Sequence, residues 1–247
     1  MILFYPDIPR YPSRVWDICE KRKIPYHNDP YKDHDLQFYW SYHKDVRIPD
    51  RYDSFADVNA GCWDITKSKV DRIFNDISID PELYDGVCIK KSDRQSVQDV
   101  ELVQCPVRPE PGYVYQKNIE NKEGDRWIEY RVTYADGIKM ILKYYNVLPF
   151  NLTSKEKKKR IIERIPIDSI FTASQEFELM IKCREFGFDY GEIDVLLDDG
   201  YPVVIDVNNV AGMGRGVDAF DPYRQEMADI FENFINKSYE NRANRGY

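Results

Sequence analysis

The feature that most constrains the fold is a pair of apolar segments, 191–197 and 203–209, in which acidic and amide residues recur at alternate positions. Because strand side chains point alternately to opposite faces, this spacing predicts a β-hairpin. A three-residue turn at 198–200, with Gly200 in the left-handed region, puts an aliphatic set on one face: Ile193, Val195, Leu197, Val203, Ile205 and Val207. The opposite face then carries Glu192, Asp194, Leu196, Val204, Asp206 and Asn208.

The second face gathers carboxylates and an amide beside aliphatic neighbours. Such groups are costly to bury unless their charge and hydrogen bonding are compensated. Clustered hard oxygen ligands are also what a Mg²⁺ ion that bridges phosphates requires. The hairpin is therefore interpreted as a metal site, and an ordinary amphipathic hairpin with one wet face is the alternative.

Composition sets the class of protein. A chain of 247 residues with 43% hydrophobic content can bury a substantial core in two or three compact subdomains. No apolar run approaches the roughly 20 residues of a membrane span, and no signal peptide is recognised, so a cytoplasmic protein without membrane attachment is expected. The net charge of −8 disfavours a nucleic-acid binder. Five widely spaced cysteines are expected to be reduced thiols.

Residues 1 to about 60 alternate short apolar segments with one helical stretch, which indicates a small α/β lobe. A strand is expected at 2–5, and a helix follows with Ser13 as its cap. An amphipathic helix leading out of this lobe is indicated by the spacing of Val70, Ile73, Phe74 and Ile77.

The middle of the chain is rich in strands, which are expected at 86–90, 100–103, 113–116, 127–132 and 140–142. The basic run 155–160, followed by Ile161 and Ile162, is interpreted as a solvated helix face.

Two helices are expected later in the chain. Thr172 and Gln175 have capping-box spacing for a helix from 173, with an apolar stripe formed by Phe177, Met180, Ile181 and Phe186. A last helix begins at Asp221-Pro222 and turns inward Met227, Ile230, Phe231, Phe234 and Ile235.

In this order the segments resemble those of ATP-grasp enzymes, and 191–213 is similar to the terminal metal-binding motif of D-alanine-D-alanine ligases. The resemblance covers most of residues 60–216. It implies an α+β fold in which two ATP-grasp subdomains clasp ATP, preceded by the small α/β lobe. The expected divisions are 1–63, 64–115 and 116–247. The implied ligands of Mg²⁺, as two ions for which Mn²⁺ could substitute, are Asp194, Asp206 and Asn208.

The same resemblance implies a nucleotide site. The strand 87–92 resembles the one that bears a phosphate-binding lysine, with Lys90 favoured over Lys91, and 113–119 resembles the hinge that meets the adenine. The implied contacts to ATP are Lys69, Lys90, Gln116, Lys117, Asn118, Glu129 and Lys143. Arg131 is expected to meet phosphate or substrate charge. The alternatives are an exposed strand lysine at 90, a solvated helix end at 69, and a cross-strand ion pair between Glu129 and Arg131.

The implied reaction is that of a ligase. A substrate carboxylate attacks the γ-phosphoryl group of ATP, and an amine then attacks the acyl phosphate, from which water must be excluded. Catalysis would come from positioning and from cations that neutralise phosphate charge. The expected partners are ATP and a small-molecule or peptide substrate, and a homodimer is one assembly open to such a chain.

Three departures qualify the resemblance. Glu192 stands where the family's ligases often have an arginine, so we hypothesise that Glu192 acts as a base or orients the nucleophile while Arg131 or Arg215 supplies the positive charge. Its alternative role is an ion pair with a neighbouring lysine. The expected phosphate loop 92–99 lacks glycine. The segment 212–216 is glycine-rich but does not lead directly into a helix, so a Rossmann site is discounted.

Two other classes stay open. An ATP-grasp kinase that phosphorylates a small hydroxyl substrate would use the same nucleotide and metal residues, and the absence of the arginine at position 192 favours it. A nucleotide-binding protein without turnover is permitted by the altered loop, but the retained Asp194, Asp206 and Asn208 argue against it.

Overall fold

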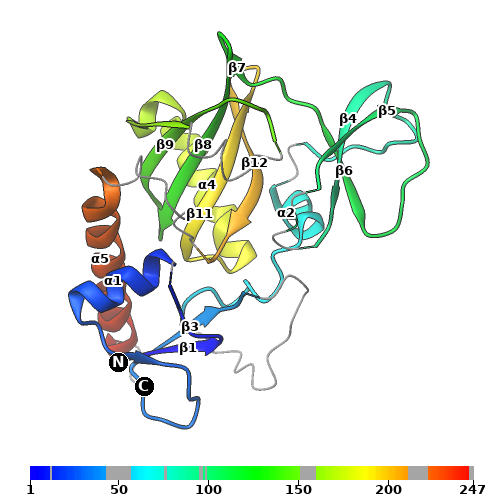
Figure 1. The fold of residues 1–247 in the computed structure, drawn as a ribbon. Coiled ribbons are helices and arrows are strands. Elements are labelled where there is room, and N and C mark those ends of the chain that lie inside the picture. Colours follow the sequence, from blue (N-terminus) through cyan, green and yellow to red (C-terminus); the bar gives the residue numbers. More distant parts are fainter. Residues whose placement is uncertain are drawn as a thin grey trace.

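The computed structural model describes residues 1–11, 13–42, 57–74, 77–94, 97, 99–150, 160–210 and 222–244. These residues form three β-sheets with helices packed beside them (Figure 1). The sheets draw on residues 2–40, 86–117 and 122–208. The divisions near residues 63 and 115 stay predictions.

The N-terminal lobe holds a parallel sheet of order β2-β1-β3, formed by β1 (Ile2–Pro6), β2 (Tyr26–His27) and β3 (Leu36–Trp40). Helix α1 (Arg14–Arg22) begins as predicted, because the Ser13 hydroxyl accepts a hydrogen bond from the Trp16 N–H. Apolar residues of α1, β1 and β3 share one core with helix α5 (Arg224–Asn244) from the far end of the chain. The predicted inward residues of α5 lie in or against the core.

The second sheet is small and antiparallel, with order β5-β4-β6. Its strands are β4 (Gly86–Ser92), β5 (Glu101–Cys105) and β6 (Tyr113–Lys117). In Figure 1 this sheet stands beside the large sheet, with helix α2 (Lys67–Phe74) between them. Val70 and Phe74 of α2 are buried in the core of the large sheet, and Asp71 of α2 accepts a hydrogen bond from Gln116 of β6, so this helix joins the small sheet to the large one.

The large sheet is antiparallel and has the order β10-β9-β8-β11-β12, with β7 paired to β8. The strands are β7 (Lys122–Glu123), β8 (Arg126–Ala135), β9 (Ile138–Asn146), β10 (Ile161–Ile165), β11 (Tyr190–Asp198) and β12 (Tyr201–Asn208). Ile161 and Ile162 were predicted to continue a helix face, and that was wrong, because they pair with β9 in an edge strand. A short 3₁₀ turn, η1 (Ile167–Ser169), follows β10.

Helix α4 (Ala173–Phe186) covers one face of the large sheet. It begins with the predicted capping box, in which the Thr172 and Gln175 side chains each bond the other's backbone N–H. The predicted apolar stripe was wrong at Phe177 and Ile181, whose side chains are exposed. The buried stripe consists of Leu179, Cys183 and Phe186. Both sets have helical spacing, and the sheet beneath selects the face that is buried.

The turn of the β11–β12 hairpin differs from the prediction. Asp198 pairs with Tyr201, so the turn has two residues, Asp199 (φ 51°) and Gly200 (φ 83°), as in a type I′ turn. The extra residue lies inside β12, because Asp194 pairs with Asp206 while Val195 pairs with Val204. Ile205 is left as a bulge.

The bulge changes which aliphatic residues share a face. Val204 joins Val195 in the core under α4, and Val203 joins Leu196 and Ile205 in a separate cluster, so the predicted places of Val203, Val204 and Ile205 were wrong. The polar end of the hairpin lies beyond the bulge. There Glu192 pairs with Asn208 and Asp194 pairs with Asp206, so these four residues share one face as predicted.

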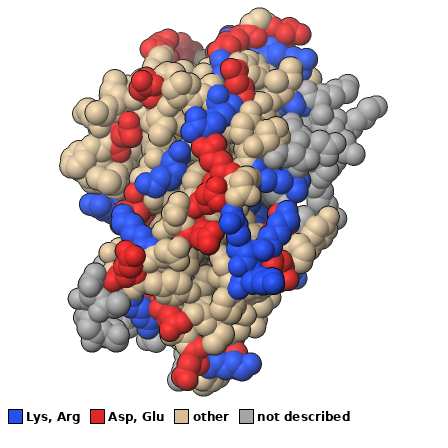
Figure 2. Space-filling model, turned by 90° about the vertical axis from the view of Figure 1, so that its left-hand side faces the viewer, with Lys and Arg blue, Asp and Glu red and all other residues tan. Residues whose placement is uncertain are grey.

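All five cysteines are buried free thiols, and the sulfur atoms of Cys88 and Cys105 lie 3.1 Å apart. No helix among the described residues is long and apolar enough to cross a membrane. Figure 2 shows basic and acidic side chains intermingled over one side of the molecule. Ion pairs such as Arg22 with Asp229, and Arg164 with Glu226, link separate surface elements, although exposed pairs add little stability.

Candidate functional site

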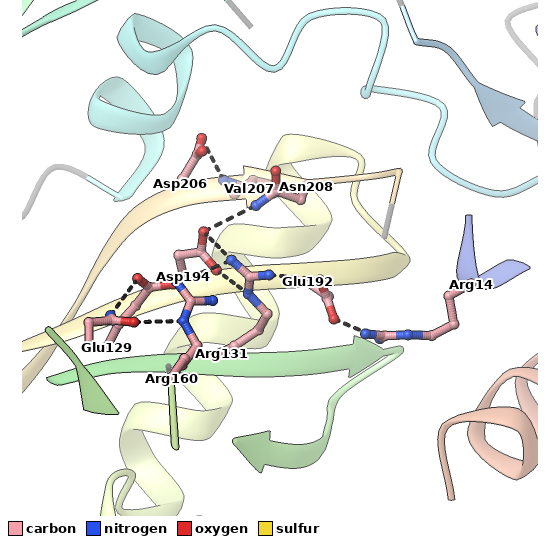
Figure 3. A network of polar contacts seen from close by, with 10 residues as sticks. Arg14, Glu129, Arg131, Arg160, Glu192, Asp194, Asp206, Val207 and Asn208 are labelled. Atoms are coloured by element: carbon pink, nitrogen blue, oxygen red, sulfur yellow. Dashed lines mark hydrogen bonds and ion pairs between the residues drawn. The ribbon is translucent and has the colours of Figure 1, made fainter. Parts of the chain in front are cut away.

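The face of the large sheet opposite α4 carries a row of charged side chains. It runs across β8, β11 and β12 and continues to α1 (Figure 3). Its members are Glu129, Arg131, Glu192, Asp194, Asp206, Asn208 and Arg14. Strand alternation places the first six on one face, because their intervening neighbours belong to the core under α4.

Arg131 is the centre of this row. Its Nε and Nη2 atoms donate to the two oxygens of Asp194 at 2.8 and 3.2 Å, which makes a bidentate pair. Nη2 also donates to Glu129 at 3.3 Å, and Nη1 lies 3.5 Å from Glu192 Oε2. The Tyr144 ring lies under the guanidinium at 5.1 Å. Burial by itself would lower the pKa of Arg131, but the surrounding acids, first among them Asp194, raise it above its ordinary value.

The three predicted metal ligands lie together on this face. Asp194 is the direct cross-strand partner of Asp206, and the Asn208 amide donates to Asp194 Oδ2 at 3.3 Å. Burial raises the pKa of Asp194 to about 7, which Glu129 and Asp206 reinforce and Arg131 opposes. Within the described ranges no group of three His, Cys, Asp or Glu side chains is arranged for a metal, so the set is two carboxylates and one amide.

This donor set fits Mg²⁺ by its chemistry, since carboxylate and amide oxygens are hard ligands. In Figure 3 the Asp206 carboxylate and the Asn208 amide oxygen point away from Arg131, toward the side where α2 lies. Asp206 accepts a hydrogen bond from the Val207 N–H at 3.1 Å. A cation at this point would lower the cost of keeping Asp194 charged while buried.

Lys91 reaches this group from the small sheet. Its Nζ donates to the carbonyl oxygen of Ile205, the bulge residue of β12, at 3.0 Å. Burial lowers the pKa of Lys91, and the nearby Asp206 is the main influence that opposes this. Lys91 therefore lies beside the predicted metal ligands.

Lys90 points the other way, and its preference over Lys91 as the phosphate-binding lysine stays a prediction. Its Nζ donates to Glu110 at 2.5 Å and lies over the Tyr113 ring at 4.5 Å. The hydrogen bond to Glu110 raises the pKa of Lys90. Neighbouring residues of a strand face opposite sides, and no sequence pattern told which lysine faces the large sheet.

Lys69 also lies away from the row. Its Nζ donates to the carbonyl oxygens of Gly61 at 2.7 Å and Phe186 at 3.2 Å, where it ties α2 to the end of α4. Lys67, which the sequence reasoning passed over, is buried and donates to the Arg94 carbonyl at 3.0 Å. Its charge further lowers the pKa of Lys91, so Lys67 is the lysine of α2 that lies on the Lys91 side.

The predicted adenine hinge lies at the end of β6. The Gln116 side chain is buried and donates to Asp71 of α2. Lys117 donates through its backbone N–H to Ile77 at 2.8 Å and forms an ion pair with Asp198 at 2.7 Å, whereas Asn118 is exposed. An apolar cluster that sequence reasoning missed adjoins the hinge and consists of Ile77, Ile119, Leu196, Val203 and Ile205.

Lys143 lies on the face of the large sheet that α4 covers, opposite the charged row, and its contact with phosphate stays a prediction. It is paired across the strands with Tyr130 of the α4-side core and donates to Glu123 at 2.5 Å. Glu129 lies on the site face and bonds Arg131 and the Asn146 amide, the latter at 3.5 Å. The ion pair between Glu129 and Arg131, considered as the alternative, is present, but within the single strand β8 and not across strands; Asp194 of β11 is the cross-strand partner of Arg131.

Glu192 is 1% exposed and lies between two guanidinium groups. Its Oε1 is 2.6 Å from Arg14 Nη1, and its Oε2 faces Arg131. Its partners are therefore arginines rather than the lysine considered from sequence. Arg14 was missed because nothing in the sequence connects the start of α1 with β11. Arg215 and its glycine-rich loop lie outside the described residues.

No protein-family model matches the chain, and no curated protein matches it by sequence. Solved structures do match. The ATP-grasp ligase PsnB in complex with minimal precursor, Mg and ADP aligns with a TM-score of 0.57 at 14% identity, over 96% of each chain. D-alanine-D-alanine ligase from Bacillus anthracis aligns with a TM-score of 0.56 at 13% identity, over 99% of this chain and 98% of that one. The same ligase complexed with ATP gives 0.56 at 14% identity, over 99% and 97%. The chain therefore has the α+β ATP-grasp fold that the sequence resemblance implied.

Proposed function

We propose that the protein is an ATP- and Mg²⁺-dependent ligase that joins a carboxylate to an amine through an acyl phosphate. One observation carries the proposal. Asp194, Asp206 and Asn208 share one sheet face, and the buried Lys91 reaches them from the other sheet. Carboxylates and a buried cation facing one another across two subdomains suit the binding of a metal nucleotide.

The nucleotide would lie between the small and large sheets. Lys91, with Lys67 beside it, would neutralise the phosphates, and the apolar cluster at the hinge would hold the adenine. Asp194, Asp206 and Asn208 would hold Mg²⁺, which supplies positive charge to the transferring phosphoryl group. PsnB with Mg and ADP, and the Bacillus anthracis ligase with ATP, support this assignment by analogy of fold.

Arg131 would meet the developing negative charge of substrate and phosphoryl group. Its guanidinium is fixed from three sides by Glu129, Glu192 and Asp194, so its position is set before the substrate arrives. We assign Glu129 to holding Arg131 and not to the ribose. Glu192 is assigned to orienting Arg131 and Arg14, since it lies between them, and not to general-base catalysis.

The substrate is proposed to be a small molecule or peptide that carries a carboxylate. PsnB is described with a precursor peptide, which makes peptides worth testing. Cytoplasmic chemistry suits five buried cysteines that form no disulfide. A kinase was favoured by the missing arginine at position 192, but Arg14 and Arg131 bring two guanidinium groups to that residue, so the ligase is preferred.

The test measures Mg²⁺-dependent ADP release with pooled amino acids, short peptides, sugars and polyols. A ligase forms the amide product and sustains ADP release only when carboxylate and amine are both supplied, because the first step alone stops at ADP and the acyl phosphate. Release with a polyol or sugar alone would establish a kinase instead, and ATP binding without ADP in any pool would establish a protein without turnover.

The metal assignment is tested with Asp206→Asn. The variant should retain less than about a tenth of the wild-type turnover, a barrier increase of at least ~1.4 kcal/mol, because it weakens metal binding beside the phosphates. Asp199→Asn, the same change at the exposed hairpin turn, is the control and should turn over normally. Equal activities in the two variants would contradict the metal site.

A further inference from the structure

Arg14 is a buried cation whose hydrogen bonds are not accounted for. Its side chain is 3% exposed, and all three guanidinium nitrogens lack a hydrogen-bond acceptor in the described structure. Nη1 lies 2.6 Å from Glu192 Oε1, but the pair lacks hydrogen-bond geometry. Native proteins seldom leave a buried charged donor unsatisfied, so the group needs an explanation.

The guanidinium is also held in place. Arg14 is the first residue of α1, directly after the cap, and Val15 and Ile18 anchor the helix in the N-terminal core. The Arg14 charge acts on Tyr144 and Tyr190, where it opposes the increase in their pKa that burial causes. A cation fixed among buried tyrosines keeps one orientation without a ligand.

Arg14 stands at one end of the charged row. Glu192 and Arg131 follow it toward Asp194 and Asp206 (Figure 3). Lys91 lies at that other end, where its Nζ bonds the Ile205 carbonyl beside Asp206. If the Lys91 end takes the nucleotide phosphates, the Arg14 end is left for the other substrate. Glu192 engages Nη1, whereas Nε and Nη2 form a second edge of the guanidinium without an acceptor.

We propose that Arg14 binds a carboxylate of the substrate through this second edge. The edge presents two parallel N–H donors, which match the two oxygens of a carboxylate. This inference rests on the proposed function for the identity of the ligand as substrate. It makes Arg14 a specificity-determining residue that favours carboxylates over neutral alcohols.

The test is calorimetric titration of the full chain with N-acetylglycine, inorganic phosphate and glycerol, with and without Mg²⁺ and the analogue AMPPNP. Wild type should bind N-acetylglycine and not glycerol. Arg14→Gln should bind N-acetylglycine about 10-fold or more weakly, since charged hydrogen bonds are lost, with AMPPNP affinity unchanged. Arg22→Gln is the matched control, because Arg22 lies on the same helix but pairs with Asp229 and Glu232 on α5.

A second variant separates a loss of binding from a loss of folding. Arg14→Gln combined with Glu192→Gln removes both buried charges, so neither is left uncompensated. It should fold and still fail to bind N-acetylglycine. Wild-type affinity in the double variant, or tighter binding of phosphate than of N-acetylglycine, would overturn the proposal. AMPPNP binding without N-acetylglycine binding in wild type would overturn it and leave the proposed function standing. N-acetylglycine binding lost in Arg14→Gln, but without AMPPNP binding, would support the carboxylate site and refute the proposed function.

Discussion

At the scale of single residues, Lys91 joins the two sheets through one charged group. Its amino group is buried, bonds the Ile205 carbonyl and lies near Asp206 and Asp71. A buried lysine is costly unless acids or a ligand compensate its charge. The acids here belong to α2 and β12, which pack against each other.

The two neighbouring lysines give a matched pair of variants. Lys91→Met should weaken Mg·ATP binding by roughly 10- to 100-fold but leave adenosine binding nearly unchanged, because the lost interaction is with phosphate charge. Lys90→Met, on the opposite face beside Glu110, should leave both affinities unchanged. Calorimetry with ATP and adenosine measures the difference. A loss confined to Lys90→Met would restore the assignment made from sequence.

Asp71 gives a prediction about pH. Burial raises its pKa above the ordinary 3.8, with Lys91 opposing, so the folded state favours the protonated form. That contribution to stability is fully present below the unfolded pKa and is lost as pH rises through the folded pKa. Asp71→Asn, which keeps an acceptor for Gln116, should therefore gain stability relative to wild type at pH 7 and lose this advantage toward pH 4. Urea titrations at both pH values test it, and a pH-independent difference would contradict it.

The residue scale is also where prediction from sequence was weakest. Residues only one or two positions apart face different environments. The examples are Lys90 and Lys91, Lys67 and Lys69, and Lys143 and Tyr144. Composition and spacing place a lysine on a helix or strand, but they do not determine which face of that element points toward the neighbouring element. The role of Arg14 could not be predicted, because it depends on a contact with Glu192, 178 positions further along the chain, and no local pattern contains such a contact.

At the scale of elements, local signals predicted more. Ser13 and Thr172 begin helices where their capping patterns indicated, since a cap depends only on residues within one turn. The bulge at Ile205 was not predicted, because a bulge depends on pairing with the partner strand. The pairs Glu192–Asn208 and Asp194–Asp206, on the polar side of the bulge, share one face as the sequence predicted.

The hairpin turn provides a stability test. Gly200 has φ 83°, and a Cβ added to it would meet no other atom within 4 Å, so only backbone strain opposes alanine there. Gly200→Ala should reduce the free energy of unfolding by about 1 kcal/mol. Asp199→Asn should be neutral or slightly stabilising, since Asn-Gly suits a type I′ turn. Chemical denaturation measures both, and equal stability of Gly200→Ala and wild type would contradict the assigned turn.

At the scale of the whole molecule, the end of the N-terminal lobe is fastened to the large sheet by backbone contacts. Gly61 and Gly187 approach so closely that a Cβ on Gly61 would lie 1.9 Å from the Phe186 carbonyl oxygen. Lys69 bonds the carbonyl oxygens of Gly61 and Phe186. Together with the core that Val15 and Ile18 share with Tyr190 of β11, these contacts hold α1, and with it Arg14, beside the charged row.

Asn59 also links the end of the N-terminal lobe to the large sheet. It is fully buried, and its side chain donates to the Tyr190 carbonyl at 2.8 Å and accepts from the Asp189 and Tyr190 N–H groups at 2.8 and 3.0 Å. Its φ of 58° is one that asparagine tolerates better than most residues. Asn59→Ala would remove three hydrogen bonds to the backbone at the start of β11.

Asn59→Ala should therefore lower the free energy of unfolding by roughly 3 kcal/mol, at about 1 kcal/mol for each buried hydrogen bond that is lost. Asn121→Ala is the matched control, because Asn121 makes a local bond to the Ile128 carbonyl at 3.1 Å and is half-buried. Its loss should be near 1 kcal/mol. Urea unfolding followed by circular dichroism measures both. Equal losses would mean that Asn59 does not fasten the lobe, and the placement of Arg14 beside Glu192 would then need another cause.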